Sequence, residues 1–226
     1  MGAQHPNVAV RYANLARIHQ GLGELPQAEA CYRKALEIEQ AAPGPLSARA
    51  VSRMNGLGML LREQHRLEEA RRLLQDALEA SRAAFERQPA EVSNIQTNLG
   101  VVLQELGRID EARAAYREAL EREEAAFGPL HARTAARYSI LAGRYLAMGD
   151  DAEARRLYEH ALAASDRAYG PVHVRTGEAA AALGGLLRRL GEEEKGIALE
   201  RHALGVLEKV LPPGHPRLKA LRDMIG

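Results

Sequence analysis

The chain has 226 residues, of which 46% are hydrophobic and 27% are charged, and its formal net charge is +1. This near balance argues against bulk electrostatic attraction to nucleic acid, which needs a basic patch or stripe. The single cysteine, Cys31, excludes a disulfide framework within the chain, and no apolar stretch approaches the roughly 20 residues that a membrane-spanning helix needs.

Residues recur at an interval of 42 along almost the whole sequence. Three positions keep one residue type in all five copies, and a fourth changes only once, from alanine to Gly196. These positions are Leu15, Leu57, Leu99, Leu141 and Leu183; Leu36, Leu78, Leu120, Leu162 and Leu204; Ala35, Ala77, Ala119, Ala161 and Ala203; and Ala28, Ala70, Ala112 and Ala154. A period of this length predicts a solenoid, in which each unit buries its apolar face against its neighbours.

Each unit reads as two helices, and the third unit shows the pattern. Residues 94–106 carry apolar side chains at helical spacing, Gly107 follows as a tight turn, and a second helix is predicted over 109–127. By the same register, the predicted units are 5–46, 47–88, 89–130, 131–172 and 173–214.

Glycine marks the turn inside four units and the end of several second helices. The turn glycines are Gly23, Gly107, Gly149 and Gly191. The second unit has His65 at this place. The predicted second-helix ends are Gly44-Pro45, Gly128-Pro129 and Gly170-Pro171. Glycine accepts a left-handed cap and proline cannot continue a helix, so both residues suit a helix end.

The two ends of the chain differ in their predicted packing. Pro216 has the register of Pro6, so residues 216–225 are expected to form a sixth first helix that caps the last repeat. Met1 has the register of Phe127, the aromatic residue that closes a second helix. The chain therefore begins at a repeat boundary. We expect either a fragment of a longer array or a partly exposed first helix.

The spacing within each unit resembles the tetratricopeptide repeat. In the first unit, the residues that carry this resemblance are Tyr12, Leu15, Ala16, Gly23, Ala28, Tyr32 and Ala35. The 42-residue length and segments 4–9, 13–16 and 28–38 are similar to the kinesin light chain subclass. The resemblance implies an all-α fold, an α-solenoid that winds as a right-handed superhelix of five helix-turn-helix units with a short C-terminal capping helix. It also implies one array over 1–226.

The fifth unit departs from the family pattern at two positions. Gly196 replaces the second-helix alanine, and Glu200 replaces the aromatic residue. Because a glycine inside a helix costs about 1 kcal/mol relative to alanine, this unit is expected to be the most loosely packed.

In this family the first helices line a concave groove, and the resemblance places ten polar side chains there. They are Arg17, Gln20, Ser52, Asn55, Arg62, Asn94, Thr97, Gln104, Ser139 and Arg188. Amide side chains can pair with the backbone of an extended peptide, and arginine can bind a carboxylate with two hydrogen bonds. Small residues in units four and five leave room for a bulky side chain. The alternative is that these are merely solvated polar residues.

The resemblance also bears on the partner. Chaperone-tail binders of this fold carry lysine with asparagine or arginine four residues later, and none of the four lysines here has that neighbour. Kinesin light chains imply peptides with acidic and aromatic residues. The predicted function is therefore a non-catalytic protein–protein interaction scaffold that binds a peptide or partner segment. The alternative is a sensing or oligomerisation segment of a larger bacterial regulator, with a possible homo-oligomer.

Catalysis, metal and cofactor binding are not expected. His131, His173 and His215 share one register position, but helices of adjacent repeats lie about 8–10 Å apart or more, too far to share one ion. These histidines are expected to have a structural role near helix starts. An RNA reader would need polar pairs and positive charge along the groove, which units four and five lack.

Two further features concern the origin and location of the chain. Only 4 of its 31 basic residues are lysine, which indicates a GC-rich bacterial genome. The N-terminus lacks the charged region and apolar run of a signal peptide. With the absence of a disulfide framework, these features predict a cytoplasmic protein.

Overall fold

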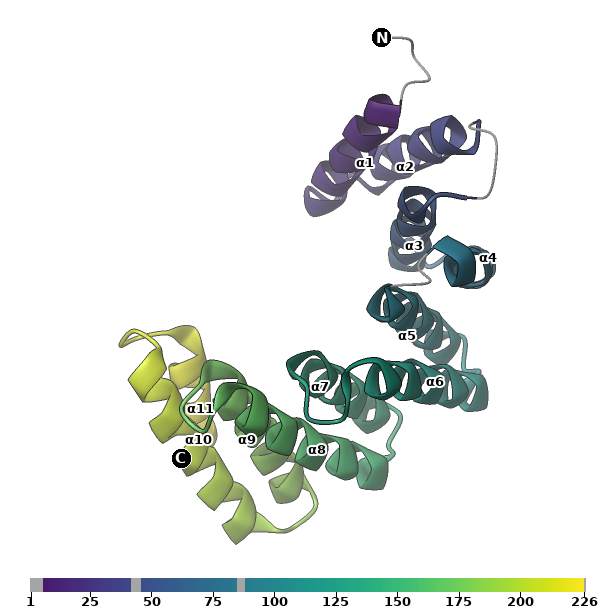
Figure 1. Cartoon of the computed structure of the whole chain (residues 1–226). Coiled ribbons are helices and arrows are strands. Elements are labelled where there is room, and N and C mark those ends of the chain that lie inside the picture. The colour runs from purple at the N-terminus through teal and green to yellow at the C-terminus, as the bar shows by residue number, and fades with distance from the viewer. Residues whose placement is uncertain (1–5, 42–45, 85–87, 226) are drawn as a thin grey trace. The chain divides into compact units, whose positions relative to one another are not determined.

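The computed structural model describes residues 6–41, 46–84 and 88–225, which form 11 α-helices and no strand (Figure 1). In chain order they are α1 (Pro6–Gly21), α2 (Leu25–Gln40), α3 (Ala48–Glu63), α4 (Leu67–Ala84), α5 (Pro89–Glu105), α6 (Ile109–Phe127), α7 (Ala132–Ala147), α8 (Asp151–Tyr169), α9 (Val174–Arg189), α10 (Glu193–Val210) and α11 (Pro216–Ile225). The prediction of an all-α solenoid of helix pairs is confirmed. Within these described ranges, no helix combines the length and the apolarity that crossing a membrane requires.

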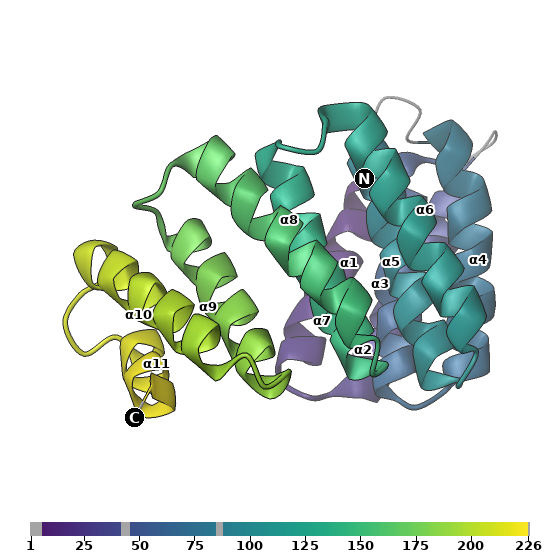
Figure 2. The ribbon, with the colours of Figure 1, turned by 90° about the horizontal axis from the view of Figure 1, so that it is seen from below.

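The chain divides into two compact units, residues 1–122 and 123–226. Unit 1 holds α1 to α5 and most of α6, and unit 2 holds the end of α6 and α7 to α11. Inside each unit, successive helices pack against one another, as α9 and α10 do in Figure 2. The single array over 1–226 remains a prediction.

The helices pack closely because small residues face large ones. A Cβ atom added to Gly100 would lie 2.5 Å from Cε1 of Tyr116, and one added to Gly58 would lie 2.7 Å from Cγ of Leu74. Both distances are shorter than real Cβ contacts, so a larger residue at either position would force the facing side chain to move. Alanine and leucine dominate the buried side chains.

The turns follow the predicted glycines, including their exception. Gly23, Gly107 and Gly149 have φ values of 76°, 76° and 77°, in the left-handed region that glycine tolerates best. His65 has φ of 59° and is the one non-glycine residue with positive φ in the described ranges. The helix ends at Gly128 and Gly170 have φ of 86° and 87°, whereas Gly44-Pro45 lies outside the described residues.

The recurring histidines cap the first helices, which confirms their predicted structural role. Nδ1 of His131 accepts a hydrogen bond of 3.1 Å from the backbone N–H of Arg133. Its ring stacks on Phe127, with 5.1 Å between the ring centroids. The equivalent residues one repeat later are His173, Arg175 and Tyr169. Both histidines thereby join the end of one repeat to the start of the next.

The expectation of a loosely packed fifth repeat is wrong. A Cβ atom on Gly196 would lie 2.7 Å from the backbone oxygen of Gly184 and 2.4 Å from Cγ of Arg188. Glu200 is only 1% exposed and forms an ion pair of 3.2 Å with Arg188. The two glycines bring the backbones of α9 and α10 together, and an ion pair stands where other repeats have an aromatic or leucine side chain.

The last helix covers the end of unit 2, as predicted. Leu218 and Leu221 of α11 are buried in a cluster with Ala180, Ala203 and Leu207. Because α11 supplies the apolar contacts that a further repeat would supply, it acts as the C-terminal cap.

Candidate functional site

The candidate site is the surface formed by the first helix of each repeat, which we call the first-helix face. In unit 1 this face consists of α1, α3 and α5, and in unit 2 it consists of α7 and α9. Eight of the ten predicted groove residues belong to unit 1, and Ser139 and Arg188 belong to unit 2.

In unit 1, polar side chains on neighbouring first helices bind one another. Gln20 donates a hydrogen bond of 2.8 Å to Glu63. Arg62 forms an ion pair of 2.7 Å with Glu105. Each pair is separated by 43 residues, one repeat plus one position. Gln20 and Arg62 therefore already have partners within unit 1 before any ligand binds.

A third pair of the same kind lies further along these helices. Nδ2 of Asn98 donates to Oδ1 of Asn55 at 2.9 Å, again across 43 residues. Asn98 thus links α5 to α3. The pair uses one acceptor of the Asn55 side chain, whose amide nitrogen remains able to donate to a ligand.

Five further predicted residues in unit 1 differ in how much surface they offer. Arg17 and Ser52 are exposed, although the Ser52 hydroxyl donates to the Ala48 carbonyl at 2.9 Å. Asn94 and Gln104 are half-buried. Gln104 accepts a hydrogen bond of 2.9 Å from the Tyr116 hydroxyl. Thr97 is 5% exposed and donates to the Ser93 carbonyl at 2.8 Å. Arg17 therefore offers an accessible charge and Thr97 offers almost no surface.

In unit 2, the first-helix face contains a pocket of about 260 Å³ between α7, α8 and α9. Small side chains of Ala136 and Ser139 line it from α7, and Ala182 lines it from α9. Tyr158 lines it from α8, and burial raises the pKa of its phenol. The pocket agrees with the prediction that small residues in units four and five leave room for a bulky side chain.

The rim of this pocket carries charge. Glu178 lies 3.6 Å from the guanidinium of Arg175, and it also pairs with Arg217 of α11. Arg175 is exposed, whereas Glu178 is half-buried. An apolar interior with a charged rim suits a ligand side chain that is apolar at its tip and is flanked by polar groups.

Arg188 is bound by its own chain. It pairs with Glu193 at 2.9 Å and with Glu200 at 3.2 Å, and it also donates to the backbone carbonyl of Met224 in α11. Its role in the structure is to tie α9 to α10 and to the capping helix. The sequence signal for this role is Glu200 at the aromatic position of the repeat.

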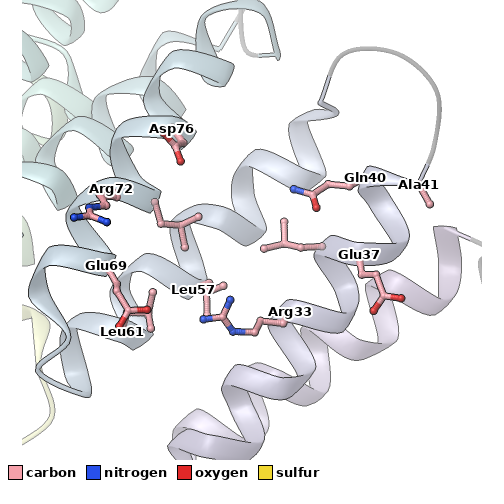
Figure 3. Close-up of a pocket in the computed structure, with 11 residues that line it drawn as sticks. Arg33, Glu37, Gln40, Ala41, Leu57, Leu61, Glu69, Arg72 and Asp76 are labelled. Atoms are coloured by element: carbon pink, nitrogen blue, oxygen red, sulfur yellow. The ribbon is translucent and has the colours of Figure 1, made fainter.

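A second pocket, of about 640 Å³, lies between α2, α3 and α4 of unit 1 (Figure 3). Leu57 and Leu61 of α3 form part of its apolar lining, and Arg33 and Arg72 reach it from α2 and α4. The sequence prediction missed this pocket because it considered only the first helices. The sequence feature that could have indicated this pocket is the set of charged residues spaced three and four apart on the two second helices.

No group of three or more histidine, cysteine or acidic side chains in the described part of the chain is placed to hold a metal ion. The chemistry available on the first-helix face is hydrogen bonding, ion pairing and apolar burial.

Comparison with known proteins identifies the family. The tetratricopeptide repeat model matches residues 2–83, 91–167 and 141–209, so the chain belongs to the tetratricopeptide repeat family. Repeats of this family generally serve as non-catalytic scaffolds for protein–protein interaction. None of the curated proteins matches the chain.

Solved structures show the same fold at low sequence identity. BtubC (BKLC) from P. vanneervenii is 24% identical with a TM-score of 0.77, over 94% of this chain and 85% of that chain. The nearly identical kinesin light chain-like repeats of Podosopora anserina are 18% identical with a TM-score of 0.75, over 91% and 97%. The apo form of the quorum sensor NprR from B. thuringiensis is 15% identical with a TM-score of 0.67, over 98% and 58%. These likenesses confirm the predicted fold, an α-solenoid of tetratricopeptide-like helix pairs.

Proposed function

We propose that this protein is an interaction scaffold whose first-helix face binds an extended peptide or segment of a partner protein. One large apolar side chain of the partner enters the unit 2 pocket. The observation that carries the proposal is the pocket of about 260 Å³ between α7 and α9. It includes the predicted groove residue Ser139, and it includes Ala136 and Glu178, which have the register of the predicted groove residues Ser52 and Asn94.

The size of the pocket favours a side chain over a free small molecule. Pockets for small molecules usually measure about 300–1,000 Å³, and this one is slightly smaller. An aromatic side chain buries roughly 150–250 Å² of surface and would supply most of the binding free energy in such a pocket. The rest of the peptide would lie along polar side chains, which fix its direction.

The charges near the pocket support an acidic partner. Arg175 is exposed on its rim. Arginine binds carboxylates with two parallel hydrogen bonds, so an acidic residue beside the aromatic one would add both affinity and orientation. The half-buried Glu178 disfavours a second acidic residue directly above it. No catalytic step, cofactor, nucleic acid or membrane belongs to this proposal.

The test is a selection from a peptide library, followed by binding measurements with the best sequence. Ala136→Leu places a larger side chain at the pocket and should weaken binding at least tenfold, because it occupies the space of the incoming side chain. Ala147→Leu is the matched control, an exposed residue of the same helix that does not line the pocket. Equal affinity in both variants would refute the proposal.

The alternative is a sensing or oligomerisation segment of a larger bacterial regulator. Its support is the exposed apolar side of α1 and the similar fold of the quorum sensor NprR. A cytoplasmic location would suit both proposals, because an unpaired cysteine is typical of a reducing compartment. Light scattering over a range of concentrations separates the two. A dimer that dissociates on dilution, with no peptide selected by the pocket, supports the alternative.

A further inference from the structure

One side of α1 exposes apolar residues whose equivalents in α3 are buried. Leu15 and Ile18 are 41% and 58% exposed, whereas their equivalents in α3, Leu57 and Leu60, are 2% and 0% exposed. Among the described helices of unit 1, α2 packs against α1 and none covers this other side (Figure 1). The repeats themselves show what normally covers it, namely the second helix of the preceding repeat.

Where a first helix packs on the second helix of the preceding repeat, one pair of facing residues recurs at the same register. In unit 1, Arg53 of α3 faces Glu39 of the preceding α2, with 4.0 Å between the charged groups. In unit 2, Arg137 of α7 faces Glu123 of the preceding α6 at 3.3 Å. The arginine follows the glutamate by 14 residues in both pairs, and the two pairs are 84 residues apart, which is two repeats.

The other junctions have uncharged residues at both positions. Their residues are Ser81 with Ile95, Ser165 with Ala179, and Leu207 with Leu221, all buried. A first-helix arginine is therefore matched by an acidic residue on the preceding helix, and an apolar residue is matched by an uncharged one. Leaving a buried charge without its partner costs several kcal/mol, which explains why the two positions change together.

Arg11 occupies the arginine position of α1. It is exposed, and the described residues place no carboxylate within ion-pair distance of it. Arg11, Leu15 and Ile18 are four and three residues apart, so they form one stripe along the helix. Arg17 and Gln20 lie on a different side, because each residue turns the helix by about 100°.

We propose that this stripe of α1 binds an amphipathic helix of a partner protein, with an acidic residue of that helix paired to Arg11. The partner helix would lie on α1 as α2 lies on α3. The sequence of this chain gives the expected chemistry. Both second helices that face an arginine carry Ala-Leu-Glu-x-Glu, at residues 35–39 and 119–123, and the last glutamate makes the ion pair.

The inference does not rest on the peptide-binding proposal, because it uses another side of the helix and another kind of ligand. The pocket in unit 2 receives one side chain of a peptide, whereas α1 would receive a whole helix face. Burial of Leu15 and Ile18 would supply affinity at about 25 cal/mol per Å² of apolar surface, and Arg11 would set the register.

The test uses a synthetic peptide with the sequence of residues 109–127, labelled with a fluorophore and held helical by a lactam bridge on the side away from Glu123. The full chain should bind this peptide. Either Arg11→Glu in the chain or Glu123→Arg in the peptide should weaken binding at least tenfold. The two changes together should restore most of the affinity. Because Arg11 is exposed, circular dichroism should show an unchanged fold.

Three results would overturn the inference. The first is that the bridged peptide does not bind, and the second is that neither charge change alters its affinity. The third is self-association of the chain that Arg11→Glu abolishes, because that result identifies a second copy as the occupant. Ile18→Asp should abolish peptide binding, and Ala136→Leu should leave it unchanged. The last comparison separates a failure of this inference from a failure of the peptide-binding proposal.

Discussion

The first-helix face is built differently in the two units. In unit 1, Gln20, Asn55 and Arg62 are held by side chains of the neighbouring first helix. In unit 2, the positions equivalent to Asn55 are Ser139 and Ala181, and Ser139 lines a pocket of about 260 Å³ beside Tyr158. Equivalent positions of one repeat can therefore form either a preorganised polar surface or a cavity, depending on side-chain size.

The packing behind these faces also differs. Gly58 and Gly100 of unit 1 make room for the side chains of Leu74 and Tyr116, which can shift slightly. In unit 2, Gly196 makes room for the backbone of α9, which cannot shift without moving the whole helix. Unit 2 should therefore be the less tolerant of added volume.

The largest predicted effect tests this difference. Gly196→Ala should lower the free energy of unfolding by about 2–3 kcal/mol, because the new methyl group would meet the Gly184 backbone oxygen. Gly58→Ala should lower it less, by about 1 kcal/mol, because the Leu74 side chain can move. Urea denaturation followed by circular dichroism measures both.

Gly205→Ala is the control in the same helix. No atom lies within 4 Å of the added Cβ atom at this position, so the substitution should stabilise the protein by about 0.5–1 kcal/mol through better helix propensity. If Gly196→Ala were equally stabilising, the close approach of α9 and α10 would be refuted.

The next prediction concerns binding by unit 1. The double substitution Asn55→Ala and Arg62→Ala should weaken binding of the library-selected peptide about tenfold, because it removes the donors available to the peptide. Stability should fall by only about 1 kcal/mol, since exposed ion pairs and single hydrogen bonds contribute little. Calorimetric titration and a thermal melt give the two values. Unchanged affinity would remove unit 1 from the binding site.

A smaller effect is expected at the turn of the second repeat. His65→Gly should raise the free energy of unfolding by about 1 kcal/mol, because a residue with a side chain is strained at φ of 59°. Gly107→Ala, at the equivalent turn with φ of 76°, should lower it by a similar amount. Denaturation should therefore show changes of opposite sign in the free energy of unfolding of these two variants. Changes of the same sign would contradict the prediction.

The smallest predicted effect depends on pH and tests the junction between α2 and α3. Burial raises the pKa of the Glu39 carboxyl above its ordinary value of 4.5, although Arg53 and Arg49 partly oppose the shift. The folded state therefore holds the Glu39 proton to higher pH than the unfolded state, and stability should fall as pH rises from 4.5 through the folded pKa. Glu39→Gln should remove this part of the slope. An unchanged slope would mean that the folded protein does not shift this pKa.

Most of the fold could be predicted from the sequence because the residues that recur in each repeat are the ones that pack in the core. Leucine and alanine at fixed positions predict the paired helices, and Ile109–Phe127 has the bounds that the pattern indicates. His65 was identified as the turn exception from register alone, and its positive φ follows.

The candidate site could be predicted only in part. Register places Asn55 and Arg62 on the first helices, but their partners Asn98 and Glu105 depend on how far one repeat is displaced along the next. The sequence predicts space for a bulky side chain in units four and five. Only the structure shows the volume of the pocket and that Tyr158 of α8 lines it. The expectation of loose packing at Gly196 is wrong because helix propensity alone does not show that the Gly184 backbone lies opposite.

The most direct test of the binding proposal is the map of amide chemical-shift changes that the selected peptide causes in the full isotopically labelled chain. The largest changes are expected in α7 and α9, near Ser139 and Glu178, and Ala136→Leu should abolish them. Changes centred on Arg33 and Arg72, between α2 and α4, would contradict it.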